Sequence, residues 1–122
     1  LHGGHRLISG LGEARHTGTA VLLHAQLAGK VSRIPLQSGR ITAVDIDDYL
    51  GHNFRIISVY APHLGYDHAC LLDMYATLQE LVTEAANTRR RLLIAGDFNT
   101  QLRVGLRSEL LFGYASEHKL TI

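Results

Sequence analysis

The chain has 122 residues, of which 46% are hydrophobic and 19% are charged, and its formal net charge is +1 at pH 7. This length suits one domain with a single compact core, and the composition excludes a disordered or highly charged tail protein. No apolar run approaches the ~20 residues that cross a bilayer, and so small a net charge does not identify a nucleic-acid partner. A single cysteine, Cys70, excludes an internal disulfide and fits a reducing compartment.

The first third of the chain predicts short strands. Residues 6–8 and 18–23 are aliphatic or β-branched, and the glycines between them suit turns, so we expect neighbouring strands. Residues 30–36 alternate poorly and include a proline, which favours an edge strand. His2 and His5 are spaced like metal ligands, but the glycines between them and their terminal position favour a mobile tail.

Residues 41–47 and 54–60 predict an antiparallel pair of strands joined by a loop over residues 48–53. Both faces of the pair carry apolar side chains, which is typical of a sheet that is covered on both sides. Asp45 and Asp47 would form a carboxylate pair on the first strand, but solvated charge at a strand edge is the better interpretation.

The clearest helix is predicted over residues 67–88. Its apolar residues recur at three- and four-residue steps, namely Leu71, Tyr75, Leu78, Val82 and Ala85. Asp67 suits the N-cap, and the basic residues 89–91 suit the C-terminal end of the helix dipole. A strand, a helix and a strand with short connections form a crossover unit, so the strands on either side of this helix should end side by side.

The second of these strands predicts the candidate site. Residues 92–95 are apolar and read as a buried strand, which ends in a glycine followed by Asp97, Phe98 and Asn99. If the backbone stays extended, Asp97 and Asn99 share one face while Phe98 enters the core. The alternative is a turn in which the Asp and the Asn bind local backbone donors. In either case the crossover brings Asp97 near Tyr60.

After this strand, residues 100–107 read as a loop and Ser108 as the cap of a short helix. The apolar side of that helix contains Leu110, Leu111, Tyr114 and Ala115. Residues 120–122 are strand-like.

Gly96-Asp97-Phe98-Asn99 resembles the Gly-Asp-Phe-Asn signature of the endonuclease/exonuclease/phosphatase superfamily. That superfamily includes deoxyribonuclease I, the apurinic endonucleases and the endonuclease domains of LINE-type retrotransposons. Residues 59–63 resemble its Tyr-x-Pro strand end, and residues 38–41 its Gly/Asp-Arg strand start. Residues 107–111 and 117–120 resemble the helix and following strand of the retroelement version. The resemblance therefore covers nearly the whole chain in order.

This resemblance implies an α/β fold, a DNase I-like α/β/β/α sandwich of which residues 1–122 would be a single, incomplete domain. It implies Mg²⁺-dependent hydrolysis of DNA phosphodiesters by an endonuclease linked to a reverse transcriptase, in an intracellular, nuclear setting. Asp97 would orient or deprotonate the attacking water, Asn99 would bind a nonbridging oxygen, and Tyr60 would contact the phosphate. His63 and Thr100 would bind the substrate.

The resemblance also places partners of the site outside the chain. The Glu that holds magnesium is expected before Leu1 and a catalytic His beyond Ile122, so we expect a piece of a longer product that is inactive alone. Gln79-Glu80 and Asp67-His68 imitate these groups. The first pair lies inside the predicted helix, and neither pair has the family's place in chain order.

Arg40 is read as a strand-end salt-bridge residue rather than a phosphate ligand. Two other functions remain open, namely a phosphatase of the same fold that acts on a small phosphate ester, and a non-catalytic remnant used for binding.

Overall fold

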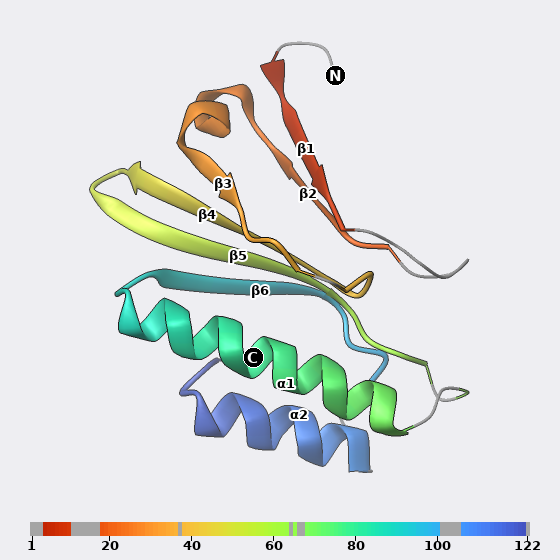
Figure 1. The fold of residues 1–122 in the computed structure, drawn as a ribbon. Coiled ribbons are helices and arrows are strands. Elements are labelled where there is room, and N and C mark those ends of the chain that lie inside the picture. Colours follow the sequence, from red (N-terminus) through yellow and green to blue (C-terminus); the bar gives the residue numbers. More distant parts are fainter. Residues whose placement is uncertain are drawn as a thin grey trace.

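The computed structural model describes residues 4–10, 18–36, 38–63, 65, 68–100 and 106–121, with the side chain of residue 106 excepted. His2, Asp67 and Ile122, on which parts of the predictions rest, lie outside these residues. The described part is a mixed α/β fold with two sheets (Figure 1). Its strands are β1 (Arg6–Ser9), β2 (Ala20–Leu23), β3 (Val31–Arg33), β4 (Ile41–Tyr49), β5 (His52–Tyr60) and β6 (Arg91–Asp97). Its helices are the 3-10 helix η2 (Ala25–Lys30), α1 (His68–Asn87) and α2 (Leu106–Glu117).

Strands β1 and β2 form a two-stranded antiparallel sheet, which confirms the predicted neighbouring strands. The larger sheet has the order β3-β4-β5-β6, and β3 lies at its edge as predicted. Pairs β3–β4 and β4–β5 are antiparallel, whereas β5–β6 is parallel. The parallel pair confirms the crossover through α1, because two parallel neighbours need a long connection.

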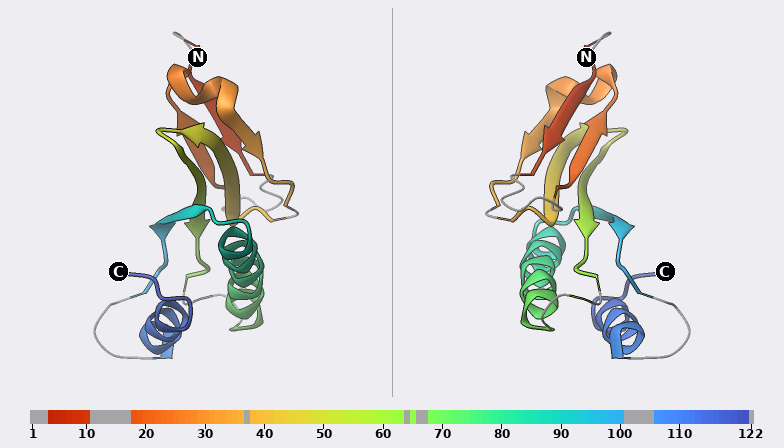
Figure 2. Two further views of the ribbon diagram at one scale, coloured as in Figure 1. Left: turned by 90° about the vertical axis from the view of Figure 1, so that its left-hand side faces the viewer. Right: turned by 90° about the vertical axis from the view of Figure 1, so that its right-hand side faces the viewer.

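The β4–β5 pair of the larger sheet is covered on both faces, as its alternation predicts (Figures 1 and 2). On one face the core joins sheet and helix α1 and includes Ile41, Ile57, Val59, Leu71 and Leu78. On the other face, β1 and β2 contribute Ile8 and Leu23, which pack with Val44 and Ile46. Helix α2 lies alongside α1, and the rings of Tyr75 and Tyr114 meet with centroids 5.3 Å apart.

Strand β6 differs from the buried strand that the sequence predicts. Leu93 is 58% exposed, and residues 95–97 are exposed as well. The reason is that β6 lies at the end of the described strand order, while the β1–β2 sheet contacts β4 and β5. Leu92 and Ile94 still pack against the core on the helix side.

Three boundaries also differ from prediction. The β4–β5 loop is shorter than residues 48–53, because both strands continue to a turn at Leu50 and Gly51. Helix α2 begins at Leu106, so Ser108 lies inside it as a buried residue and is not its cap. Residues 120 and 121 form no strand.

Candidate functional site

The ends of β5 and β6 lie next to each other, as the crossover predicts. In the parallel register Tyr60 is the partner of Asp97, and the backbone N–H of Ala61 donates to the Asp97 carbonyl at 2.8 Å. We call Tyr60, Ala61, Asp97 and Asn99 the strand-end site.

Gly96 permits this close approach of the two strands. Its φ is +147°, and a Cβ at this position would lie 2.0 Å from the carbonyl oxygen of Val59. That contact is far inside van der Waals distance, and glycine is the residue that reaches such a backbone conformation without steric penalty. The glycine of the motif therefore serves the backbone geometry from which Asp97 projects.

Asn99 closes a turn instead of extending the strand. Its φ is +46°, in the left-handed region that Asn tolerates better than most residues. Its backbone N–H donates to Asp97 Oδ1 at 2.8 Å, and its side-chain Nδ2 donates to the Ala61 carbonyl at 2.7 Å. The prediction that Asp97 and Asn99 share a face by extended alternation is therefore wrong. The turn alternative is right for Asp97, which binds a local backbone donor, whereas the Asn99 side chain donates to a carbonyl of the other strand end.

The turn fixes the Asp97 carboxylate and links both strand ends. One carboxylate oxygen accepts the Asn99 N–H, while the side chain as a whole is exposed. Phe98 packs against the core, as predicted. The backbone of the site is thus held in place, and its carboxylate is accessible to solvent.

Arg40 supports Tyr60 from the neighbouring strand start. The Tyr60 N–H donates to the Arg40 carbonyl at 2.8 Å, and Arg40 Nη1 donates to the Tyr60 carbonyl at 3.2 Å. The guanidinium carbon lies 5.6 Å from the centre of the Tyr60 ring, within reach of a cation–π attraction. Arg40 is 8% exposed, which agrees with a structural role.

The two predicted substrate-binding residues lie in the loops that follow the strands. His63 is exposed, and its Nδ1 accepts the backbone N–H of Gly65 at 3.0 Å. The Thr100 hydroxyl donates to the Phe98 carbonyl at 2.8 Å. Both therefore flank the strand-end site, one beyond each strand.

Arg107 is a site neighbour that sequence reasoning missed. From the first turn of α2 it donates to the carbonyls of Pro62 and His63, the latter at 3.0 Å, and to that of Asn99 at 3.5 Å. The pattern of residues 107–111 indicated a helix, but nothing in it indicates that the Arg107 side chain contacts distant backbone carbonyls.

The carboxylates of β4 belong to an ion-pair network at a distance from the strand ends. Arg55 is 1% exposed. It binds Asp45 through Nε at 2.8 Å and Nη2 at 2.9 Å, and Glu84 of α1 at 2.9 Å. Arg90 binds both Asp45, at 3.3 Å, and Asp47, at 2.8 Å. The description of Asp45 as solvated is wrong, since its side chain is 14% exposed and paired, whereas Asp47 is 52% exposed.

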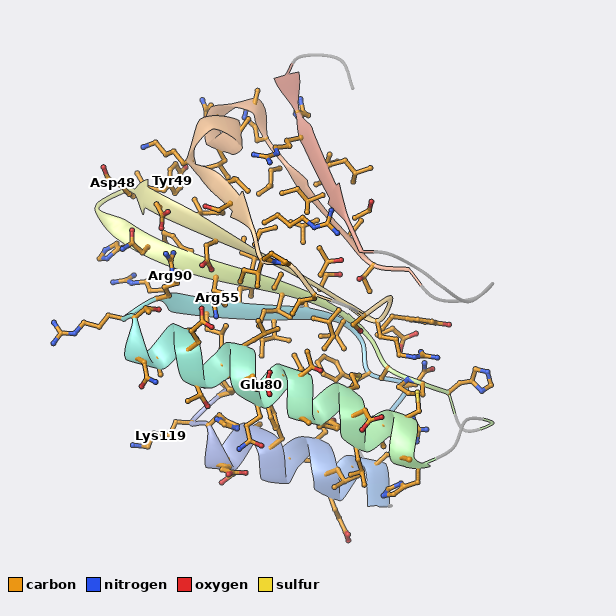
Figure 3. All side chains as sticks on the ribbon, viewed as in Figure 1. Asp48, Tyr49, Arg55, Glu80, Arg90 and Lys119 are labelled. Atoms are coloured by element: carbon orange, nitrogen blue, oxygen red, sulfur yellow. The ribbon has the colours of Figure 1, made fainter. Side chains whose placement is uncertain are left out.

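Of the two imitating pairs, only Gln79-Glu80 lies wholly within the described residues. Gln79 and Glu80 are both exposed on α1. Figure 3 shows Glu80 in the middle of this helix. His68 is the first residue of α1, and its partner Asp67 lies outside the described residues.

Magnesium prefers hard oxygen ligands and is usually held by one or two carboxylates together with substrate phosphate. Asp97 offers one such carboxylate. Within the residues that the structure describes, no group of three or more His, Cys, Asp or Glu side chains is placed to hold a metal ion.

The chain matches no protein-family model and no curated protein with which it was compared. Among the described helices, none combines the length and apolar character needed to span a membrane.

Proposed function

We propose that the strand-end site is part of the hydrolytic centre of a DNA endonuclease with a DNase I-like sandwich fold, of the retroelement type. The observation that carries this proposal is the register of β5 and β6, which pairs Tyr60 with Asp97 while Asn99 bonds to both strand ends. The Gly-Asp-Phe-Asn and Tyr-x-Pro motifs thus lie together in one site. Their first residues, Gly96 and Tyr60, are 36 positions apart in sequence (96 − 60).

In this proposal each side chain acts through a donor or acceptor that its contacts within the protein do not occupy. Asp97 accepts the Asn99 N–H through Oδ1, so its second oxygen can orient a water and accept its proton. Asn99 gives one amide hydrogen to Ala61, which leaves the second hydrogen for a nonbridging phosphate oxygen. The Tyr60 hydroxyl donates to the phosphate, and His63 and Thr100 contact the backbone on either side.

A phosphodiester is negatively charged and repels an anionic nucleophile, so hydrolysis needs a cation near the phosphate. In this proposal Mg²⁺ is the cofactor of the complete domain, where it supplies that charge. In the proposal, carboxylates outside the described residues complete its ligands.

The exposure of the site favours DNA over a small phosphate ester. Asp97 and His63 are exposed, whereas small-molecule sites are usually concave and enclose their ligand. A cavity of ≈ 440 Å³ lies between β6, α1 and α2, and neither Tyr60, Asp97 nor Asn99 lines it. A polymer backbone can reach an open strand end without entering a pocket.

In this proposal the endonuclease is linked to a reverse transcriptase and acts in the nucleus.

The test is a nicking assay with supercoiled plasmid and, in parallel, an inositol phosphate as a small ester. The full-length protein should nick plasmid with Mg²⁺, lose this activity in EDTA, and leave the small ester intact. Hydrolysis of the ester without nicking would establish the phosphatase instead. Plasmid binding without either reaction would establish a binding remnant.

A further inference from the structure

Arg107 bridges the loops that leave the two strands of the strand-end site. Its guanidinium donates to the carbonyls of Pro62 and His63, which follow β5, and to that of Asn99, which follows β6. One side chain on α2 therefore holds both loops from a third element.

An arginine in the first turn of a helix is electrostatically unfavourable, and the backbone carbonyls that Arg107 binds explain its presence there. A cation in the first turn of a helix lies at the positive end of the helix dipole, where it gains nothing from the helix itself. The planar guanidinium has five N–H donors in a rigid fork and can serve several acceptors at once. Backbone carbonyls that leave a sheet lose their ladder partners and need donors. Arg107 meets that need on both loops.

We propose that Arg107 is a positioning residue of the strand-end site. By holding the Asn99 carbonyl it keeps the left-handed turn that presents Asn99 N–H to Asp97, and by holding Pro62 and His63 it fixes the chain next to Ala61. The guanidinium acts on the protein backbone and does not contact DNA. The catalytic consequence rests on the proposed function, whereas the structural coupling of the loops does not.

The coupling is tested on the chain itself by amide hydrogen exchange, residue by residue, in Arg107→Ala and Arg107→Lys. Charge-assisted bonds to carbonyls are stronger than neutral ones, so their loss in Arg107→Ala should speed exchange at Ala61 and Asn99 by at least about tenfold. Ile57, in the middle of β5, serves as the internal reference and should not change. Arg107→Lys keeps one charged nitrogen and should fall between wild type and Arg107→Ala.

Arg91→Ala is the matched control, because it removes the same charge from an exposed residue at the opposite end of β6. It should leave exchange at Ala61 and Asn99 within about twofold of wild type, the range expected for a surface change. Faster exchange confined to α2 in Arg107→Ala, with Ala61 and Asn99 unchanged, would show that Arg107 only docks the helix and would overturn the proposal.

The catalytic consequence is tested with plasmid and Mg²⁺ in the full-length protein. Arg107→Ala should lower kcat by at least about tenfold with little change in KM, because displaced catalytic groups weaken transition-state contacts rather than binding. A raised KM with unchanged kcat would mean that Arg107 contacts DNA, which contradicts the proposal. If the wild-type protein does not nick plasmid, the proposed function fails, but the exchange measurement still decides whether Arg107 couples the loops.

Discussion

Gly96 shows how one residue of a motif can be required by backbone geometry. A Cβ there would meet the Val59 carbonyl oxygen at 2.0 Å, so any other side chain must push β6 away from β5. The same displacement would separate Asp97 from Tyr60, since both lie at the next register position. The glycine and the acidic residue are therefore linked through the strand pair.

We predict that Gly96→Ala lowers the free energy of unfolding by about 3 kcal/mol, from the clash and the positive φ together. Gly113→Ala is the matched control, because nothing lies within 4 Å of its added methyl in helix α2. It should stabilise the protein by up to about 1 kcal/mol, the difference in helix propensity. Urea denaturation of both variants measures this, and equal stability of the two would contradict the account of Gly96.

At the scale of single residues, the sequence predicts those parts of the site whose conformation depends on local chemistry. The Asp and Asn types favour turns, and the turn at Asn99 is the alternative that the sequence left open. The contacts of Arg40 and Arg107 were not predictable, because their acceptors are backbone carbonyls from distant segments, and a carbonyl carries no sequence signature.

Between elements, the ion pairs of Arg55 join β4, β5 and α1. The guanidinium is buried on the helix side of the sheet and also donates to the Leu81 carbonyl at 2.8 Å. The hydrogen bond and charge of Asp45, partly opposed by burial, raise the pKa of Arg55, so this residue stays charged. A buried charge of this kind depends on its partners.

We predict that Asp45→Asn destabilises the fold by about 3 kcal/mol, because it leaves the Arg55 charge buried with one partner fewer. Asp47→Asn removes the same charge from the same strand, but Asp47 is 52% exposed and Arg90 keeps Asp45 as a partner, so the change should matter by less than about 1 kcal/mol. Thermal or urea unfolding of both variants makes the comparison. A similar decrease in the free energy of unfolding in both variants would mean that the burial of Arg55 does not determine how much a lost carboxylate destabilises the protein.

Helix α2 carries a polar group that lacks a partner among the described residues. The Tyr114 hydroxyl is buried without a hydrogen bond, and the Tyr114 ring contacts the rings of Tyr75 and His118. Burial raises the pKa of Tyr114 above its ordinary value, because the charged phenolate is disfavoured there. Ionisation therefore costs the protein no stability below the unfolded pKa of about 10, whereas above it the unfolded state ionises first and the stability of the folded state falls as the pH rises.

We therefore predict that Tyr114→Phe raises the free energy of unfolding by about 1 kcal/mol at pH 8, since it removes an unpaired buried hydroxyl. The advantage over wild type should grow above pH 10, where the wild-type protein loses stability by ionisation. Urea denaturation at several pH values between 8 and 11 measures both effects. A less stable Tyr114→Phe variant at pH 8 would show that the hydroxyl has a partner.

For the whole molecule, periodicity was a sufficient guide to the order and type of most elements. The alternation of residues 41–47 and 54–60 and the stripe of helix α1 correctly gave a pair of strands covered on both faces. The burial of β6 could not be derived in this way, because an apolar run does not reveal how many neighbours its strand has. Leu93 looks like a core residue in sequence and is exposed in the described structure.

The central claim is that the convergence of two strand ends makes Asp97 part of a hydrolytic centre. The measurement that tests it most directly is Mg²⁺-dependent nicking of supercoiled plasmid by the full-length protein, compared between wild type and Asp97→Ala. Asp73→Ala, which removes an exposed carboxylate of α1, is the matched control.

The account predicts that Asp97→Ala lowers the nicking rate by at least about 100-fold, as expected when a group that acts on the transition state is removed. The variant should keep its circular dichroism spectrum and unfolding midpoint, and Asp73→Ala should nick like wild type. A folded Asp97→Ala variant that nicks plasmid at the wild-type rate would contradict the account.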